Sequence, residues 1–409
     1  MRRLATLWPA AIVAVGLLPA PAVALDEAIG RALFRRAWVP APSATRADDG
    51  LGPLFDARSC AACHPAGDRP VVEIDRAGQP SARGLIVRLA RDDGSADPVY
   101  GRQLQHEAVT GVPVEATVTV GSATAVVDGR RLARPLPRPS GFGYGRLDPD
   151  TRVSFRLAPP LFGLAAIDDV PDAAIRAQAE RQAAAGGEVR GRVSEIVDAN
   201  GARRVGRFGF KAQEIDLAHQ SAAAFSTDMG MSSPWRPAAE GDCTDAQAAC
   251  RAAPQGAPDR MGPHEIDAAI VERIVAYLRS LPSPPPPGGR DVAARGEALF
   301  AAIGCAACHG SELGGLPPIR SDLLLHDLGE GLSFGHGEGG ASAREWRTAP
   351  LAGLGHALAR GAGLLHDGRA KDAEAAILWH DGEARGARHR FGALEAADRA
   401  ALLAFLASL

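Results

Sequence analysis

The sequence has little net charge, few aromatic residues and, beyond its N-terminal segment, no long uncharged apolar run. A formal net charge of -3 at pH 7 argues against a nucleic-acid partner. Arginine, aspartate or glutamate interrupts every later apolar stretch, so we expect no membrane span in the mature chain. Aromatic residues make up 5% of the chain, whereas glycine (47) and proline (31) are abundant. This composition favours compact helical cores surrounded by much loop.

Cysteine is scarce, and four of the six cysteines belong to two copies of the pentapeptide Cys-Ala-Ala-Cys-His, at residues 60–64 and 305–309. Cys-x-x-Cys-His is the attachment pattern of c-type haem, in which both thiols bond to the haem and the histidine becomes the proximal iron ligand. A zinc site or a thioredoxin-like pair also uses Cys-x-x-Cys, but two identical copies, each followed by histidine, favour haem. The expected haem-binding residues are Cys60, Cys63, His64, Cys305, Cys308 and His309.

The N-terminus has the layout of a secretory signal peptide. Arg2 and Arg3 precede the apolar run of residues 10–18, and the small residues 22–24 offer a cleavage site before Leu25. We therefore expect a signal peptide over residues 1–24 and a soluble mature protein in a bacterial periplasm, where c-type haem is normally attached. An uncleaved anchor is the alternative.

The last two cysteines, Cys243 and Cys250, are neighbours in sequence. In an oxidising compartment we expect them to form a local disulfide. A reactive thiol pair is the alternative, but nothing basic lies between them to favour a thiolate. With no spare reactive cysteine, a dithiol mechanism is unattractive.

The chain looks duplicated. Residues 30–34 (Gly-Arg-Ala-Leu-Phe) precede the first haem motif and residues 296–300 (Gly-Glu-Ala-Leu-Phe) precede the second, and each segment predicts an opening helix. Residues 274–281 and 401–409 have apolar positions at helical spacing and predict two closing helices. A proline-rich stretch, residues 282–289, predicts a linker between the halves.

We therefore predict a mainly α fold of two cytochrome c-like helical domains, an N-terminal one over residues 25–287 and a C-terminal one over residues 288–409. The first carries a long loop-rich insertion between Pro65 and Arg260 that contains short β-strands. Residues 116–120 and 124–127 favour strands, so a small β-hairpin is expected there.

The second domain lacks the methionine that is the usual distal ligand of a simple cytochrome c. Every methionine and tyrosine of the chain precedes Cys305, so a distal ligand from within that domain is most naturally histidine. Spacing alone does not rank the candidates, which are His326, His336, His356, His366, His380 and His389. Most of them are expected to have packing or surface roles.

Several longer segments resemble the bacterial di-haem oxidoreductases that are labelled as peroxidases or "thiol oxidoreductases". This family is itself similar to the di-haem cytochrome c peroxidases and to the enzyme that matures methylamine dehydrogenase. The resemblance covers nearly the whole mature chain. Its carriers are residues 97–105, 158–164, 206–212, 228–230, 344–348 and 366–370.

This resemblance ranks the histidines and supplies a reactive centre. In the peroxidases, the axial ligand of the second haem follows a His-x-Gly stretch by fourteen residues, and the same count from His366 reaches His380. The second haem would then be ligated by two histidines, with His326 as the main competitor for the distal place. The peroxidases also have a glutamine eight residues before an acid-base glutamate at the open haem. Gln220 and Asp228 match that pair. The alternative for Asp228 is a turn or helix cap.

Three departures or additions concern the same region. Phe210 stands where the peroxidases have a tryptophan between the haems, so a radical at this site is in doubt. Leu157 replaces an asparagine that helps to bind calcium in the peroxidases. Calcium is compatible with carbonyl and water ligands, but nothing in the sequence supports it. Met229 and Met231 are expected in the core, although one could ligate the first iron in a resting state.

The resemblance implies a di-haem oxidoreductase with two covalently bound c-type haems. It would reduce hydrogen peroxide with electrons from a small donor protein such as a cytochrome c, through a C-terminal relay haem to an N-terminal reactive haem. One alternative is a non-catalytic di-haem electron-transfer protein. Another is an oxidase of a partner protein or metal that is linked to iron uptake.

Overall fold

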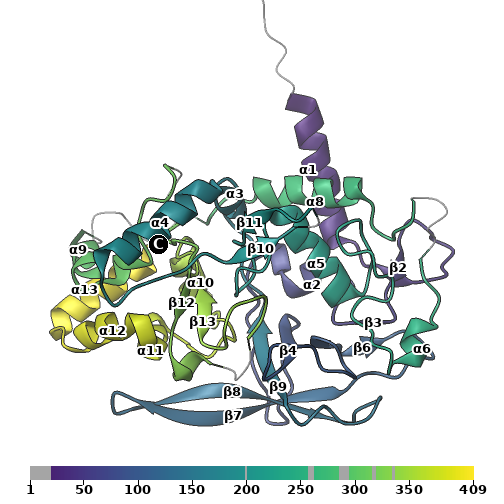
Figure 1. Ribbon diagram of the computed structural model, residues 1–409, viewed down its shortest axis with the longest axis horizontal. Coiled ribbons are helices and arrows are strands. Elements are labelled where there is room, and N and C mark those ends of the chain that lie inside the picture. Colours follow the sequence, from purple (N-terminus) through teal and green to yellow (C-terminus); the bar gives the residue numbers. More distant parts are fainter. Residues whose placement is uncertain (1–19, 199, 257–261, 285–293, 316–318, 334–336) are drawn as a thin grey trace, which may run out of the picture.

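The computed structural model describes residues 20–198, 200–256, 262–284, 294–315, 319–333 and 337–409 (Figure 1). We call residues 20–284 the first half and residues 294–409 the second half. The helices are α1 Ala20–Arg35, α2 Cys60–Cys63, α3 Leu164–Asp168, α4 Asp172–Ala185, α5 Leu217–Met229, α6 Ala248–Arg251, α8 Ala268–Ser280, α9 Ala294–Ala302, α10 Leu354–Ala359, α11 Ala373–Trp379, α12 Arg385–Gly392 and α13 Ala396–Ala407.

The strands form several small sheets. They are β1 Val39–Pro40, β2 Asp49–Leu51, β3 Leu54–Phe55, β4 Leu85–Arg91, β5 Gln103–Leu104, β6 Glu107–Ala108, β7 Thr117–Val127, β8 Arg130–Ser140, β9 Thr151–Leu157, β10 Glu195–Val197, β11 Arg203–Val205, β12 Leu325–Asp327 and β13 Glu345–Arg347. The largest is the antiparallel sheet of order β5-β4-β9, and β7 pairs with β8 alone.

The prediction of a mainly α fold is wrong, because the protein is 33% helix and 20% strand and has a mixed α/β fold. The insertion is the reason. The predicted strands at residues 116–120 and 124–127 are parts of one strand, β7, which pairs with β8 over eleven residues on each side. The prediction of a loop-rich insertion therefore underestimated how much of it is β-sheet.

Strand β8 is hard to predict from the sequence because it contains three prolines. Pro135, Pro137 and Pro139 alternate along the strand and face Ser122, Val120 and Val118 in turn. Because backbone N–H groups also alternate between the two edges of a strand, all three missing donors fall on the edge away from β7. The hairpin keeps its internal ladder, and its outer edge is poorly suited to pairing with a further strand.

The two halves repeat one helix pair, as the duplication predicts. Helix α1 packs on α8, and α9 packs on α13. In each pair a glycine allows the close approach: a Cβ on Gly30 would overlap the carbonyl oxygen of Arg273, and one on Gly296 would overlap that of Ala401. An aromatic pair lies one turn further on in both halves, and its ring centroids are 5.2 Å apart for Phe34 with Tyr277 and 5.4 Å apart for Phe300 with Phe405.

The predicted domain boundary between residues 287 and 288 lies outside the described residues and stays a prediction. The signal peptide over residues 1–24 lies mostly outside them too, and α1 begins at Ala20. Within the residues that the structure describes, no helix combines the length and the apolar character that crossing a membrane requires.

The helix contact at Gly296 can be tested by mutation. Gly296→Ala should lower the free energy of unfolding of the second half by about 1–3 kcal/mol, because the added methyl group forces α9 away from α13. Urea denaturation followed by circular dichroism measures this change. Gly392→Ala in α12 is the control, since a Cβ there meets nothing within 4 Å and the helix should gain stability. Equal stability of the Gly296 variant and the native protein would contradict the close approach.

Candidate functional site: a cavity shared by two Cys-x-x-Cys-His motifs

Both Cys-x-x-Cys-His motifs line one cavity of about 1240 Å³. The first half contributes Cys63 and His64, and the second half contributes the whole of residues 305–309. Cys60 itself packs against a core cluster that is formed mostly by the first half. The volume exceeds the roughly 300–1,000 Å³ of pockets that hold one drug-sized molecule. The fold therefore brings together two motifs that are far apart in the sequence.

The two motif histidines are oriented in the same way. Nδ1 of His64 lies 2.9 Å from the carbonyl oxygen of Pro159, and Nδ1 of His309 lies 3.0 Å from that of Arg320. A carbonyl only accepts, so each Nδ1 donates its hydrogen and each Nε2 keeps a lone pair. Burial lowers the pKa of both imidazoles to about 4, which keeps them neutral. This is the tautomer and charge state that a histidine needs to bind a metal through Nε2.

His380 shares this arrangement. It is the C-cap of α11, and its Nδ1 lies 2.8 Å from the carbonyl oxygen of Ala376. Burial lowers its pKa, and its charge would act on His309 across the same cavity. The lone pair on Nε2 of His380 is therefore available on the cavity side of the second motif.

His326, the main competitor, is held by carboxylates on both ring nitrogens. Its Nδ1 lies 2.7 Å from Glu383, and its Nε2 lies 3.0 Å from Asp322. Burial alone would lower its pKa, but hydrogen bonds to Asp322, Cys308 and Glu383 raise it to about 12. A doubly protonated imidazole has no lone pair for a metal.

Three other candidate histidines have partners of their own, and one of them, His366, also lines the cavity. Nε2 of His356 lies 2.7 Å from Asp68, and the ring of His366 stacks on Trp346 with centroids 3.9 Å apart. His389 lies 3.3 Å from Arg388. His336 falls outside the described residues.

Helix α5 forms the wall of the cavity on the side of the first motif. Asp216 caps its N-terminus by accepting from the backbone N–H of His219, and Gly230 ends it in the left-handed conformation. The residues of α5 that face the cavity follow the helical repeat: Gln220, Ala223, Ala224, Thr227 and Asp228. Two alanines between the polar ends leave room beside the first motif.

Asp228 is held at the cavity wall by Gln103 of β5. The side-chain N–H groups of Gln103 donate to Oδ1 of Asp228 at 2.8 Å and to Oδ2 of Asp56 at 2.7 Å. Burial raises the pKa of Asp228 to about 6, although the bond from Gln103 opposes the shift. The backbone N–H of Asp56 donates to the carbonyl oxygen of Asp228, so the segment that leads into the first motif fixes this end of α5.

Gln220 lies on the same helix, α5, and also lines the cavity. Among the described residues, no group hydrogen-bonds its buried Oε1 atom. An orphaned acceptor at the cavity wall fits a site that takes up a ligand or water. The sequence thus located two wall residues, Gln220 and Asp228, but missed Gln103, which only the pairing of β5 with β4 brings to them.

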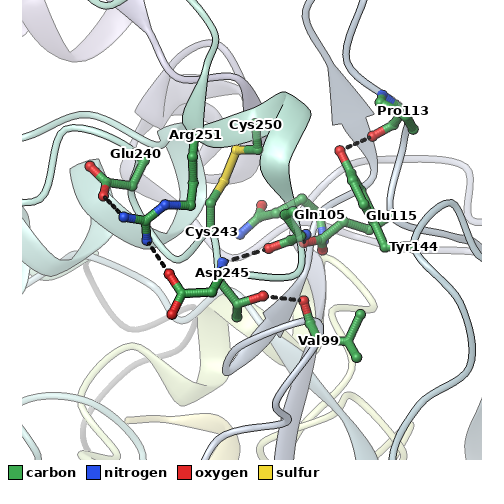
Figure 2. Close-up of a disulfide and its surroundings, with 12 residues drawn as sticks. Val99, Gln105, Pro113, Glu115, Tyr144, Glu240, Cys243, Asp245, Cys250 and Arg251 are labelled. Atoms are coloured by element: carbon green, nitrogen blue, oxygen red, sulfur yellow. Dashed lines mark hydrogen bonds and ion pairs between the residues drawn. A yellow bond between two sulfur atoms is a disulfide. The ribbon is translucent and has the colours of Figure 1, made fainter.

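The expected disulfide between Cys243 and Cys250 is confirmed (Figure 2). The loop that it closes is anchored on the first half, since the hydroxyl of Thr244 donates to the carbonyl oxygen of Val99 at 2.7 Å. Just before the disulfide, Asp242 accepts the backbone N–H groups of Arg102 and Gln103. The loop thereby fixes the strand that carries Gln103.

The region between the motifs contains an aromatic residue that sequence reasoning missed. Trp346 lines the cavity, and Nζ of Lys211 lies 3.7 Å from the centroid of its ring. Phe210 also lines the cavity, so the position occupied by tryptophan in the peroxidases is near a tryptophan from another part of the chain. Met229 and Met231 are buried in a core cluster, as expected.

The cavity fits haem groups. It offers two motifs for attachment, three imidazoles with Nε2 available and cationic side chains in its wall. Arg347 is one of these, and it donates to the carbonyl oxygens of Gly209 and Thr348 rather than to a carboxylate. Burial lowers its pKa to about 10. A half-buried cation with neutral partners suits an anionic group such as a haem propionate.

The described residues also include a group with metal-ligand spacing, formed by Cys308, Asp322 and His326. It competes with haem attachment, because Cys308 belongs to the second motif and a thioether sulfur is no longer a thiolate ligand. Leu157, which replaces the calcium-binding asparagine of the peroxidases, is buried in β9.

A cavity that joins two haem motifs defines a di-haem protein, and the comparison with protein families agrees. Residues 143–409 match the family described as "Di-haem oxidoreductase, putative peroxidase". Because the match covers more than half of the chain, the protein belongs to the di-haem oxidoreductase family. The family implies haem cofactors. The first motif precedes the matched range, which contains the second.

No curated protein matches the chain. Among solved structures, it is similar to hydrazine synthase of Kuenenia stuttgartiensis pressurised with 20 bar xenon, with 13% identity and a TM-score of 0.40 over 100% of both chains. At this TM-score the likeness carries no argument about fold or function.

The state of His326 can be tested by mutation. His326→Asn should lower the free energy of unfolding by about 3 kcal/mol, because it leaves buried carboxylates of Asp322 and Glu383 without their cation. The visible and EPR spectra of the oxidised protein should stay unchanged. Loss of a low-spin signal in this variant would instead make His326 a haem ligand.

Proposed function

We propose that the protein is a periplasmic oxidoreductase with two covalently attached c-type haems, which reduces hydrogen peroxide with electrons from a small redox donor. The observation that carries this proposal is the difference between the two ends of the cavity. Beside the first motif lie a carboxylate with a raised pKa and an orphaned amide oxygen. Beside the second lies a neutral histidine with Nε2 available.

The proposed haem-binding residues have two roles, covalent attachment of the haem and ligation of its iron. Cys60 and Cys63 would attach the first haem and His64 would be its proximal ligand, whereas Cys305 and Cys308 would attach the second. His309 and His380 would hold the iron of the second haem from both sides. With two histidines this centre is saturated and suits electron relay, whereas the first has no second protein ligand assigned and suits a small substrate.

The reaction consumes one peroxide, two electrons and two protons and yields two water molecules. When bound, the haems would supply the electron transfer and the iron at which peroxide is reduced. Asp228 in its ionised form would take the proton from one peroxide oxygen and return it to the other, which leaves as water. Gln103 holds the carboxylate in place by its hydrogen bond, and Gln220 offers an acceptor for the substrate or water.

Two other features of the chain support the proposed compartment. The N-terminal sequence has the layout of a signal peptide, and the disulfide between Cys243 and Cys250 is the kind of bond that persists in an oxidising compartment. We therefore place the mature protein in the periplasm. A cytochrome c or another small redox protein would be the electron donor.

Spectroscopy with peroxide tests the function. Visible and EPR spectra of the oxidised and half-reduced protein should show one high-spin and one low-spin haem. Adding hydrogen peroxide to the half-reduced protein should rapidly remove the high-spin signal. Two low-spin haems that do not react with peroxide would make the protein an electron carrier without peroxidase activity.

The role of Asp228 predicts a pH profile. Since the ionised carboxylate acts as base, kcat/KM for peroxide should rise with pH through about 6 and level off above it. Asp228→Asn should lower the rate by about 10²–10⁴-fold and remove this limb of the profile. Asp228→Glu should retain much of the activity, because the carboxylate is kept.

The matched control is Asp216→Asn at the start of the same helix. Asparagine caps a helix as well as aspartate does, and Asp216 lies outside the cavity wall, so this variant should keep the native rate and profile. A native profile in Asp228→Asn would remove Asp228 from the mechanism.

A further inference from the structure

The β7–β8 hairpin, which we call the strap, belongs to the first half but lies along the second. Figure 1 shows it running beneath α11 and α12. Near its base, the backbone N–H of Val120 donates to the carbonyl oxygen of Gly78 at 2.8 Å, and Val118 is part of a first-half core cluster. Near its tip, Ala125 and Leu132 pack against a cluster of the second half that includes Trp346 and Trp379.

The turn at the tip of the strap is well defined. Its two residues, Asp128 and Gly129, have φ values of 47° and 77°. An Asp-Gly pair with positive φ at both positions suits the tight turn whose twist matches that of a β-hairpin. The tip is therefore an ordered structure that can present charged groups at fixed places.

Two ion pairs fasten the tip to the second half. Oδ2 of Asp128 lies 3.0 Å from Nε of Arg388, and Nη1 of Arg130 lies 2.6 Å from Oε1 of Glu374. The Arg388 side chain is only 9% exposed, whereas that of Arg130 is 53% exposed. The pair with Arg388 is thus the better shielded one.

Arg388 connects the strap to the His380 segment. Its Nη1 donates to the carbonyl oxygen of His380 at 3.1 Å and lies 3.6 Å from Oδ1 of Asp381, while Nη2 lies 3.3 Å from His389. His380 ends α11: its backbone N–H donates to the carbonyl oxygen of Ile377 and its ring is fixed through Ala376, but its own carbonyl oxygen lies beyond the last helical turn and needs a second anchor. The guanidinium group supplies that second anchor.

We propose that the strap positions His380 as a haem ligand: Asp128 orients Arg388, Arg388 holds the carbonyl of His380, and Nε2 is thereby kept at the second haem. Asp128 and Arg388 are positioning residues, and neither touches the reacting atoms. The inference rests on the proposed ligation of the second haem by His380. It also means that a segment of the first half controls a ligand of the second.

The spin state of the second haem in the oxidised full-length protein tests this inference without any activity measurement. Arg388→Gln should raise the high-spin fraction of that haem at least tenfold, which corresponds to about 1.4 kcal/mol. Asp128→Asn keeps the turn, because Asn-Gly suits it equally well, and should give a smaller rise of about twofold, as expected for a partly exposed pair. His380→Gly gives the fully high-spin reference.

Arg130→Gln is the matched control. It removes the other ion pair of the same tip, whose partner Glu374 lies in the first turn of α11, at the opposite end of that helix from His380, so the spectrum should stay native. Arg388→Lys serves if Arg388→Gln binds fewer than two haems, because it keeps the charge and loses the fork-shaped geometry. It should also gain high-spin signal.

The outcomes separate the two proposals. If His380→Gly and the native protein have the same spectrum, the proposed ligation fails and the role of the strap fails with it. If the native second haem is low-spin and His380→Gly is high-spin, the ligation stands. A native spectrum in both Arg388 variants and in Asp128→Asn would then overturn the strap proposal alone.

Discussion

The hydrogen bond from an imidazole Nδ1 to a backbone carbonyl is the interaction on which the rest of the site depends. It fixes the ring and leaves the Nε2 lone pair for a metal in His64, His309 and His380. The acceptors are not interchangeable. Ala376 belongs to the helix that His380 ends, whereas Pro159 follows β9 and reaches His64 from far along the chain. The first motif is therefore complete only when the insertion has folded against it.

The shared cavity imposes a second constraint, because the charged side chains in its wall must be paired with one another. Glu338 of the second half binds Arg88 at 2.6 Å and Arg156 at 3.0 Å, which come from the paired strands β4 and β9. All three side chains line the cavity. Such a cluster adds little net stability, since desolvating the charges costs about as much as pairing them returns. What it does supply is a definite placement of one half on the other.

The sequence predicts the local parts of this structure and not the parts that depend on distant pairing. The two motifs and the glycine of each opening helix could be identified because each belongs to a pattern of a few neighbouring residues. Spacing alone could not choose between His326 and His380; only the resemblance favoured His380, since one of the two carboxylates that hold His326, Glu383, is distant in sequence. Gln103 lies more than a hundred residues before Asp228, and no local pattern links them. The fold class was wrong for a related reason, since alternating prolines conceal the ladder of β8.

The insertion also explains why two similar helix pairs give unlike haem sites. In the first half it supplies the acceptor for His64 and, through Gln103, the placement of Asp228. In the second half it supplies Gln182, which donates to the carbonyl oxygen of Ala307 in the second motif at 3.0 Å, and the tip of the strap, which reaches His380 through Arg388. Both sets of contacts belong to one segment, so the insertion links the two ends of the cavity. Duplication provided two similar helix pairs, and the insertion gives the two motifs different surroundings.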